Sequence, residues 1–131
     1  NTLNAMTDRA RYQFPILDFA PIVPISALEG SGLDQLLDTA IRVREQLVTR
    51  IATPLLNQAL REWADRHPLP SGKKRYRVKY ITQTSADPIK FALFVNNTHG
   101  FPGSWVSYLR NNLRQEFGLS SVPIQVDLRG R

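Results

Sequence analysis

A run of basic residues is the clearest chemical feature of the sequence. Residues 73–79 read KKRYRVK, and five of the seven are basic: Lys73, Lys74, Arg75, Arg77 and Lys79. We call these five residues the basic strip. Alternation along a strand would place Arg75, Arg77 and Lys79 on one face, about 6 to 7 Å apart. Such a row could bind RNA phosphates. It could equally be an edge strand whose charges prevent pairing with another sheet.

Two tyrosines interleave with the basic strip. Tyr76 and Tyr80 alternate with the cations, so we expect them on the opposite, apolar face. They are then core residues and not platforms on which a base could stack.

A tight turn follows a short apolar run at residues 21–25. The sequence PIVPISALEGSG passes through Ser26, Ala27 and Leu28, and the small side chains there leave backbone N–H groups near Ala27 accessible to a ligand oxygen. On its own the turn is a weak signal. The chain contains no GxxxxGK[ST] phosphate loop, because EGSG is not followed by Lys and Ser or Thr.

The other candidate residues predict no catalysis. Gly100–Gly103 has the GxxG spacing of nucleic-acid clamps but no basic residue between the glycines, so we interpret it as a loop leading into a helix. His67 and His99 are too few for a zinc site in a chain without cysteine. No spacing of carboxylates or serines suggests an active site, and we expect no catalytic residue and no metal ligand here.

Composition and charge narrow the class of partner. The chain has 131 residues, 42% hydrophobic and 21% charged, which is typical of a globular domain. The net charge of +6 favours a polyanionic partner. No apolar run is long enough to span a membrane, and the N-terminus does not resemble a signal peptide. The chain does not start with Met, which suggests a piece of a longer protein.

The first part, residues 1–50, predicts a helix over residues 3–13, a short strand at Ile22–Ile25 and a second helix. Ser31 and Asp34 have the spacing of a capping box at the start of that helix. Its apolar residues keep helical spacing and should form a buried stripe: Leu33, Leu36, Leu37, Ala40, Ile41, Leu47 and Val48. One strand and two helices offer this stripe little to pack against, so we expect its partner either elsewhere in this chain or in a part that was cut off.

The second part, residues 51–131, predicts a small α+β domain in the order helix–strand–strand–helix–strand. Thr53 followed by Pro54 begins a helix with Leu55, Leu56, Ala59, Leu60 and Trp63 inward. Strands follow at residues 75–80 and at residues 89–95, the latter apolar enough to be central and covered on both faces. A helix capped by Ser104 ends at Gly118, and a last strand runs from Val122 to Leu128 near an edge. Helices should cover one face of the three-stranded sheet.

Three stretches of this sequence resemble the C-terminal end of the Der (EngA) GTPases. They are FPILDFAPIVPISALEGSGLDQLLD, HPLPSGKKRYRVKYITQTSADPIKFALFVN and SYLRNNLRQEFGLSSVPIQVDLR. Members of that family are cytoplasmic bacterial ribosome-assembly factors with two GTPase domains in tandem and a C-terminal KH-like domain. The resemblance implies that residues 1–50 are the remnant of the second GTPase domain and that residues 51–131 form the KH-like domain.

The resemblance also implies roles for the two candidate sites. Ser26, Ala27 and Leu28 would form the turn beneath the guanine base in the parent protein, which binds GTP and Mg²⁺. The stretch in hand lacks the phosphate loop and the Mg²⁺-binding residues, so we expect it to be inactive alone and to carry no cofactor. The basic strip would contact ribosomal RNA of the large subunit or dock the protein's own GTPase domains. A purely protein-binding scaffold without RNA contact is the alternative.

Overall fold

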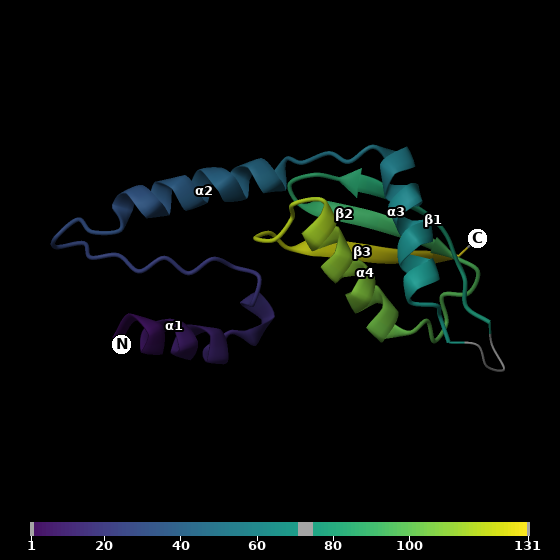
Figure 1. Ribbon diagram of the computed structural model, residues 1–131, viewed down its shortest axis with the longest axis horizontal. Coiled ribbons are helices and arrows are strands. Elements are labelled where there is room, and N and C mark those ends of the chain that lie inside the picture. Colours follow the sequence, from purple (N-terminus) through teal and green to yellow (C-terminus); the bar gives the residue numbers. More distant parts are fainter. Residues whose placement is uncertain (1, 71–74, 131) are drawn as a thin grey trace.

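The structure, a computed structural model, describes residues 2–70 and 75–130 (Figure 1). In chain order the elements are α1 (Thr2–Gln13), the short 3₁₀ helix η1 (Pro15–Leu17), α2 (Leu33–Leu47), α3 (Thr53–Arg66), β1 (Val78–Ser85), β2 (Ile89–Val95), α4 (Gly103–Glu116) and β3 (Ile124–Gly130). The second part of the chain thus has the predicted order of helix, two strands, helix and strand.

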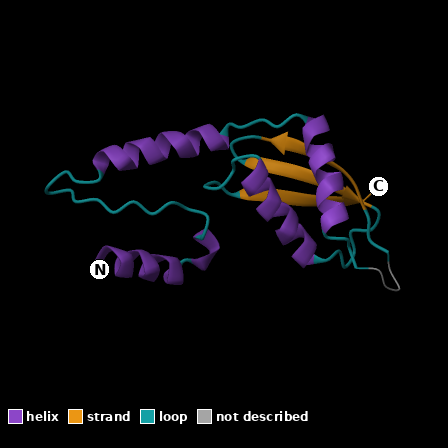
Figure 2. Cartoon of the chain, viewed as in Figure 1, coloured by secondary structure: helices purple, strands orange, loops and turns teal. Residues whose placement is uncertain are grey.

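The three strands form one mixed sheet in the order β1–β2–β3. β1 and β2 are antiparallel neighbours joined by a short turn, whereas β2 and β3 are parallel because α4 carries the chain back between them. α3 and α4 lie on the same face of the sheet (Figure 2). The predicted α+β class and the placement of both helices on one face are confirmed.

The hydrophobic core lies between this sheet face and the two helices. Trp63 of α3, Trp105 of α4 and Phe91 of β2 are its largest fully buried side chains. Both indole N–H groups have acceptors: Trp63 Nε1 donates to Glu116 Oε1 at 2.8 Å, and Trp105 Nε1 donates to the carbonyl of His67 at 2.8 Å. The core therefore buries two large indole rings while both of their N–H groups keep a hydrogen-bond acceptor. Leu55, predicted inward, is instead 56% exposed.

The central strand β2 differs from its prediction on one face. It is central, but its exposure alternates, with Phe91, Leu93 and Val95 buried and Lys90 and Phe94 partly exposed. Because both helices lie on one face, the other face of the sheet stays open. The expectation that β2 is covered on both faces was wrong, since an apolar run alone does not distinguish a two-sided strand from one whose outer residues are Lys, Ala and Phe.

The N-terminal part contains helices but no strand. Residues 21–26 run without strand pairing, although a strand was predicted at Ile22–Ile25. A strand exists only through hydrogen bonds to a neighbour, and among the described residues the nearby elements are all helices. α1 has no buried residue.

The predicted stripe of α2 is largely exposed for the same reason. Leu33, Leu36, Leu37 and Ile41 are each 39% to 62% exposed, whereas Val43 and Leu47 near the C-terminal end pack against the core. Among the described residues, the last turns of α2 pack against the core, and Thr39 in the middle of the helix is also buried.

Three predicted helix caps do not form as expected. α2 is preceded by Gly32 in the left-handed conformation, with no side-chain cap from Ser31 or a Ser31–Asp34 capping box. A Cβ at position 32 would collide with the carbonyl oxygen of Pro24 and lie 3.2 Å from the Cα of Ile25, so the close approach of that segment explains the glycine. α3 begins one residue earlier than predicted, with Ala52 as its cap in place of Thr53, and α4 begins two residues earlier, with Pro102 as its cap in place of Ser104.

The end of α2 is bonded to two loops of the second part. The N–H of Asp87, in the β1–β2 turn, donates to the carbonyl of Leu47 at 2.9 Å, and Asp87 also pairs with Arg44. On the other side, Gln46 Oε1 accepts from the N–H of Ser121 at 2.7 Å, in the loop before β3. These bonds fix the last turn of α2 against the sheet.

The linker from α2 to α3 is held by one glutamine of β1. Gln83 Oε1 accepts from the N–H of Ile51 at 2.8 Å, and Gln83 Nε2 donates to the carbonyl of Thr49 at 2.8 Å. A side-chain amide thus satisfies backbone groups of a segment that has no strand or helix of its own.

Candidate nucleic-acid interface

The described residues of the basic strip, Arg75, Arg77 and Lys79, lie at the start of β1, but they do not form a row on one strand face. Lys73 and Lys74 lie outside the described residues. Arg75 and Arg77 precede β1, and both are exposed. Their backbones are fixed by Asn96, whose Oδ1 accepts from the N–H of Arg77 at 2.8 Å and whose Nδ2 donates to the carbonyl of Arg75 at 2.8 Å.

A register shift between Val78 and Tyr80 interrupts the predicted alternation. Val78 pairs with Val95 and Tyr80 pairs with Phe94, so Lys79 is the extra residue of a bulge. Val78 packs on the core, but Tyr80 falls on the open face and is 37% exposed. The prediction that Tyr80 faces the core was wrong, because the bulge moves the side chains that follow it to the other face until a second register shift between Gln83 and Ser85. Tyr76 does pack against the core, with its ring 5.6 Å from that of Phe101.

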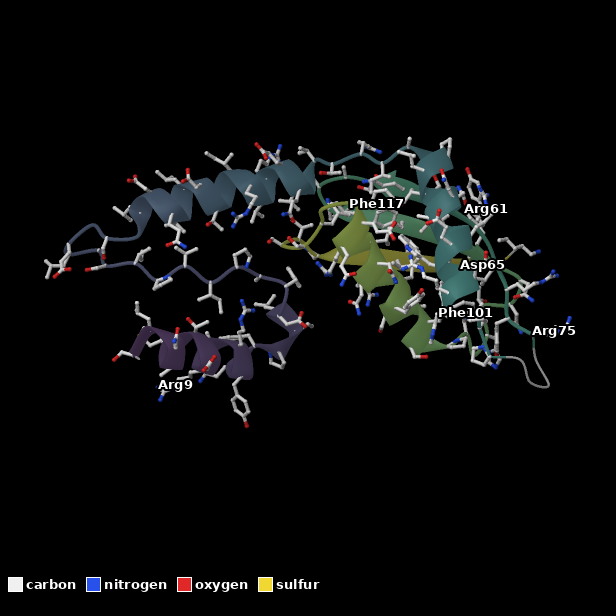
Figure 3. The ribbon with its side chains drawn as sticks, viewed as in Figure 1. Arg9, Arg61, Asp65, Arg75, Phe101 and Phe117 are labelled. Atoms are coloured by element: carbon white, nitrogen blue, oxygen red, sulfur yellow. The ribbon has the colours of Figure 1, made fainter. Side chains whose placement is uncertain are left out.

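Lys79 opens onto a groove between α3 and β1. The groove has a volume of about 250 Å³ and is lined by Asn57, Leu60, Arg61, Ala64, Asp65, Val78 and Lys79. Arg61 and Asp65 are exposed and project from α3 on the side away from α4, and Arg75 lies beyond them at the same end of the molecule (Figure 3). Lys79 and Arg61 thus bring two cations to this groove beside Asp65, and Arg75 lies at the same end of the molecule.

Arg61 was missed by the reasoning from sequence. It lies on α3, far along the chain from the basic strip, and only the packing of α3 against β1 brings the two together. A helical projection would have placed Arg61 outside the buried stripe, but nothing in the sequence fixes which neighbour it meets.

The outer edge of β1 is already closed at its centre. Asn57 of α3 donates from Nδ2 to the carbonyl of Ile81 at 2.9 Å, and Asn57 Oδ1 accepts from the N–H of Ile81 at 2.9 Å. An incoming strand would need these same two groups. Because Asn57 occupies them, protection of the edge does not depend on the charges of the basic strip.

The turn at Ser26, Ala27 and Leu28 is ordered by Ser26. Its Oγ accepts from the N–H of Glu29 at 3.2 Å, its carbonyl accepts from Gly30 at 2.8 Å, and its own N–H donates to the carbonyl of Ser31 at 3.0 Å. Leu28 is 96% exposed. Within residues 2–70 and 75–130, no protein acceptor bonds the amides of Ala27 and Leu28. The turn therefore leaves two backbone donors without an acceptor among the described residues.

The remaining sequence candidates have structural roles. In the GFPG stretch, Phe101 is buried between Tyr76 and Trp105, so the loop anchors the start of α4. The carbonyls of His67 and His99 accept hydrogen bonds from Trp105 and Tyr76. In the described ranges, no group of three His, Cys, Asp or Glu side chains could hold a metal ion. The helices described there are also too short or too polar to cross a membrane.

One partly buried cation, Arg114, belongs to the scaffold and not to the interface. Burial lowers the pKa of Arg114 from the ordinary arginine value, and nearby Arg110 lowers it further, while Asp18 acts in the opposite direction. The guanidinium donates to the carbonyl of Leu119 and lies 5.0 Å from the ring centroid of Phe19. Arg114 thus fixes the loop before β3 and attaches residues 18–19 to α4.

Comparisons with known proteins match this chain to one family. A family described as "KH-domain-like of EngA bacterial GTPase enzymes, C-terminal" matches residues 50–129. GTPase Der of Borreliella afzelii (strain PKo) is 42% identical over 125 residues, which are 95% of this chain and 28% of that protein. GTPase Der of Caldanaerobacter subterraneus subsp. tengcongensis is 37% identical over 132 residues, covering 100% of this chain and 30% of that protein. The chain therefore spans less than a third of the length of these relatives.

Proposed function

The chain belongs to the KH-domain-like family found at the C-terminus of EngA bacterial GTPases, and we propose that it anchors such a GTPase to ribosomal RNA. In this proposal the whole protein binds GTP and Mg²⁺ and acts in assembly of the large ribosomal subunit in the cytoplasm. The stretch in hand contributes no catalytic residue.

The observation that carries the proposal is the gathering of exposed cations at the start of β1 and at the α3–β1 groove beside it. Arg75, Arg77 and Lys79 come from one segment, and Arg61 comes from α3 on the other side of the groove. Cations that are exposed and held by ordered backbone can approach phosphates without unfolding any element. The net charge of +6 adds a long-range attraction for a polyanion.

The contacts should be to phosphates and not to base edges. Arginine and lysine side chains on an exposed surface, with Asp65 the only acidic residue among the lining residues of the groove, provide charge without a pattern of donors and acceptors that reads sequence. We therefore expect little sequence preference from this surface.

The Ser26–Leu28 turn supports the part of the proposal in which the whole protein binds GTP. Two backbone donors without a protein acceptor, on a turn that Ser26 orders, suit the carbonyl oxygen of a guanine base. Phosphate and Mg²⁺ contacts would come from other parts of the whole protein. In this proposal, residues 1–50 complete a nucleotide site that they cannot form alone.

A second function, as a scaffold on which GTPase domains dock, is favoured by a different observation. The exposed apolar residues of α2 and the groove beside it, about 350 Å³ and lined by Pro21, Val23, Leu36, Thr39, Ala40, Val43, Arg44 and Leu47, suit contact with protein. The two functions use different surfaces, so one protein can have both.

The test compares two charge-matched triple variants in RNA binding. Arg75→Ala/Arg77→Ala/Lys79→Ala removes three cations of the basic strip. Arg9→Ala/Arg42→Ala/Arg50→Ala removes three exposed arginines of the N-terminal part and leaves the same net charge. Fluorescence anisotropy with several unrelated single-stranded RNAs, at several salt concentrations, gives the affinity and its salt dependence for each protein.

We expect the first variant to bind every RNA more weakly and to flatten the log–log salt dependence by roughly 2, about 0.7 for each lost phosphate contact. The control variant should keep the wild-type slope. If both variants weakened RNA binding equally, the loss would be explained by net charge alone. That result would contradict an RNA-binding site at the basic strip. Absence of RNA binding at low salt would leave the scaffold function in its place.

A further inference from the structure

We propose that the open face of the sheet is a second RNA-binding surface, on which a base of a single-stranded segment stacks against Tyr80. This inference rests on the proposed RNA contact and adds a separate site with a different kind of interaction. Tyr80 pairs with Phe94, and Phe94 pairs with Arg129, so these three residues form one row across β1, β2 and β3 on the same face.

The aromatic pair is placed on this face by the bulge at Lys79. Phe94 lies between the buried residues Leu93 and Val95, so it points away from the helices. Tyr80 is its partner, with ring centroids 6.0 Å apart and an interplanar angle of 53°. Without the extra residue in β1, Tyr80 would have faced the core.

Cations border the aromatic pair on several sides. Arg129 follows in the same row, and Lys90 lies further along β2 on the same face. Arg77 immediately precedes the core-facing Val78, so alternation places it on the open face as well. The acidic residue of this face, Asp127, accepts a hydrogen bond from Gln125 at 3.0 Å. An aromatic surface bordered by cations fits a strand of RNA, which presents both bases and phosphates.

The same face is poorly suited to a protein partner. The rows beside the aromatic pair carry Thr82, Gln125 and Asp127, and Ala92 is fully buried between its neighbours. Apolar exposure is thus confined to Tyr80 and Phe94. By contrast, the exposed apolar residues of α2 form the larger surface of the kind that protein interfaces use.

The two surfaces can serve one strand of RNA. Lys79 opens onto the α3–β1 groove, whereas Arg77 and Tyr80 lie on the open face, so the start of β1 separates the sites by a single strand's width. A single strand that contacts phosphate-binding groups at the groove can pass over this edge and place a base on Tyr80. Duplex RNA could not do this, because its bases are stacked inside the helix.

The test separates stacking from charge by using variants without any change in charge. Tyr80→Leu keeps an apolar side chain but removes the ring, Tyr80→Phe keeps the ring, and Tyr12→Leu removes an 86% exposed tyrosine of α1 as a matched control. All are measured in the full 131-residue chain by anisotropy with a single-stranded 12-nucleotide RNA. The wild type is also measured with the same RNA carrying abasic positions. Hydrogen exchange of β1 and β2 checks that each variant keeps the sheet.

We expect Tyr80→Leu to weaken binding about tenfold, within the 5- to 150-fold range of one base stacked on an aromatic side chain. Tyr80→Phe and Tyr12→Leu should stay within about twofold of the wild type. The abasic RNA should bind the wild type about as weakly as the intact RNA binds Tyr80→Leu, with the salt slope unchanged in both cases. This second arm needs no protein variant, so it holds even if Tyr80→Leu disturbs the sheet.

Three outcomes overturn the inference. Equal affinity for intact and abasic RNA, with a basic-strip variant still weakened, would remove the stacking site and leave the proposed RNA function standing. Loss of binding to a GTPase domain by Tyr80→Leu, with RNA affinity unchanged, would make the face a protein contact. No RNA binding by the wild type at low salt would overturn both proposals together.

Discussion

Asn57 shows how much a single side chain can decide in this domain. Its amide bonds both polar backbone groups of Ile81 at the outer edge of β1, and Nδ2 also donates to the carbonyl of Thr53 at 2.9 Å within α3. One residue therefore joins a helix to a strand, shields the edge from pairing and forms part of the wall of the α3–β1 groove.

Replacing Asn57 by Ala should destabilise the domain by about 1 to 3 kcal/mol, because the N–H and C=O of Ile81 lose their partners in a partly buried place. Chemical denaturation measures the free energy of unfolding. Gln58→Ala, an exposed change at the next position of α3, is the control and should cost less than about 0.5 kcal/mol. Equal stability of the two variants would mean that the edge of β1 does not need Asn57.

For single residues, the sequence predicts which side chains matter better than it predicts the face of the sheet on which each side chain lies. Exposure of Arg75, Arg77 and Lys79 and the core role of Tyr76 follow from composition and alternation. Tyr80 does not, because its direction depends on a bulge at Lys79 that arises only when β1 pairs with β2. No local propensity marks that position, since the residues around it all favour or tolerate a strand.

At the scale of elements, α2 is held by bonds of unequal strength. The ion pair of Arg44 and Asp87 joins side chains that are 63% and 47% exposed, so water and salt weaken it. The Gln46 Oε1 bond to the N–H of Ser121 is partly buried and unaffected by salt. We therefore assign most of the attachment of α2 to Gln46 and to the backbone bond of Leu47.

Gln46→Ala should speed hydrogen exchange of the Ser121 amide and of the last turn of α2, and should cost about 1 kcal/mol. Arg44→Ala should cost no more than about 0.5 kcal/mol, and that cost should vanish at high salt. Glu45→Ala, an exposed change between these positions, is the control for helix propensity. A larger effect for Arg44→Ala than for Gln46→Ala would reverse our assignment.

Element order in the second part could be predicted because each element carries its own periodic signal and punctuation. The local sequence pattern could not decide whether the strand at Ile22–Ile25 and the buried stripe of α2 would form, because both depend on neighbouring elements. Most of those apolar residues are exposed here, and the described residues offer them no second strand. The spacing of apolar residues shows which face of an element would be buried, but it does not show which other element would cover that face.

For the whole molecule, order should decrease from the C-terminal sheet to the N-terminal helix. α3 and α1 have similar lengths, but α3 buries Leu56, Leu60 and Trp63, whereas α1 buries no residue. A helix of this length without tertiary packing is marginal in water.

Hydrogen exchange in a dilute monomer should therefore show strong protection for amides of α3, β2 and α4, and little protection for those of α1. Deleting residues 1–32 should leave the free energy of unfolding of the remainder within about 0.5 kcal/mol, because the deletion removes mostly exposed residues. Its control is the full chain under the same conditions. Protection of α1 equal to that of α3 would show a packing partner that the structure of one chain does not contain.

Gln83 has a mechanical consequence. A linker of a few residues between two helices would ordinarily be a hinge. In the linker from α2 to α3, however, both the oxygen and the nitrogen of the Gln83 amide are hydrogen-bonded to the backbone. α2, 15 residues or about 22 Å long, is then a rigid lever seated on the sheet. A displacement of the N-terminal end of α2 by ~4 Å corresponds to a rotation of about 10° over this length, and the sheet would rotate with the helix. A partner that moves residues 33–40 would therefore reorient Tyr80 and the basic strip together.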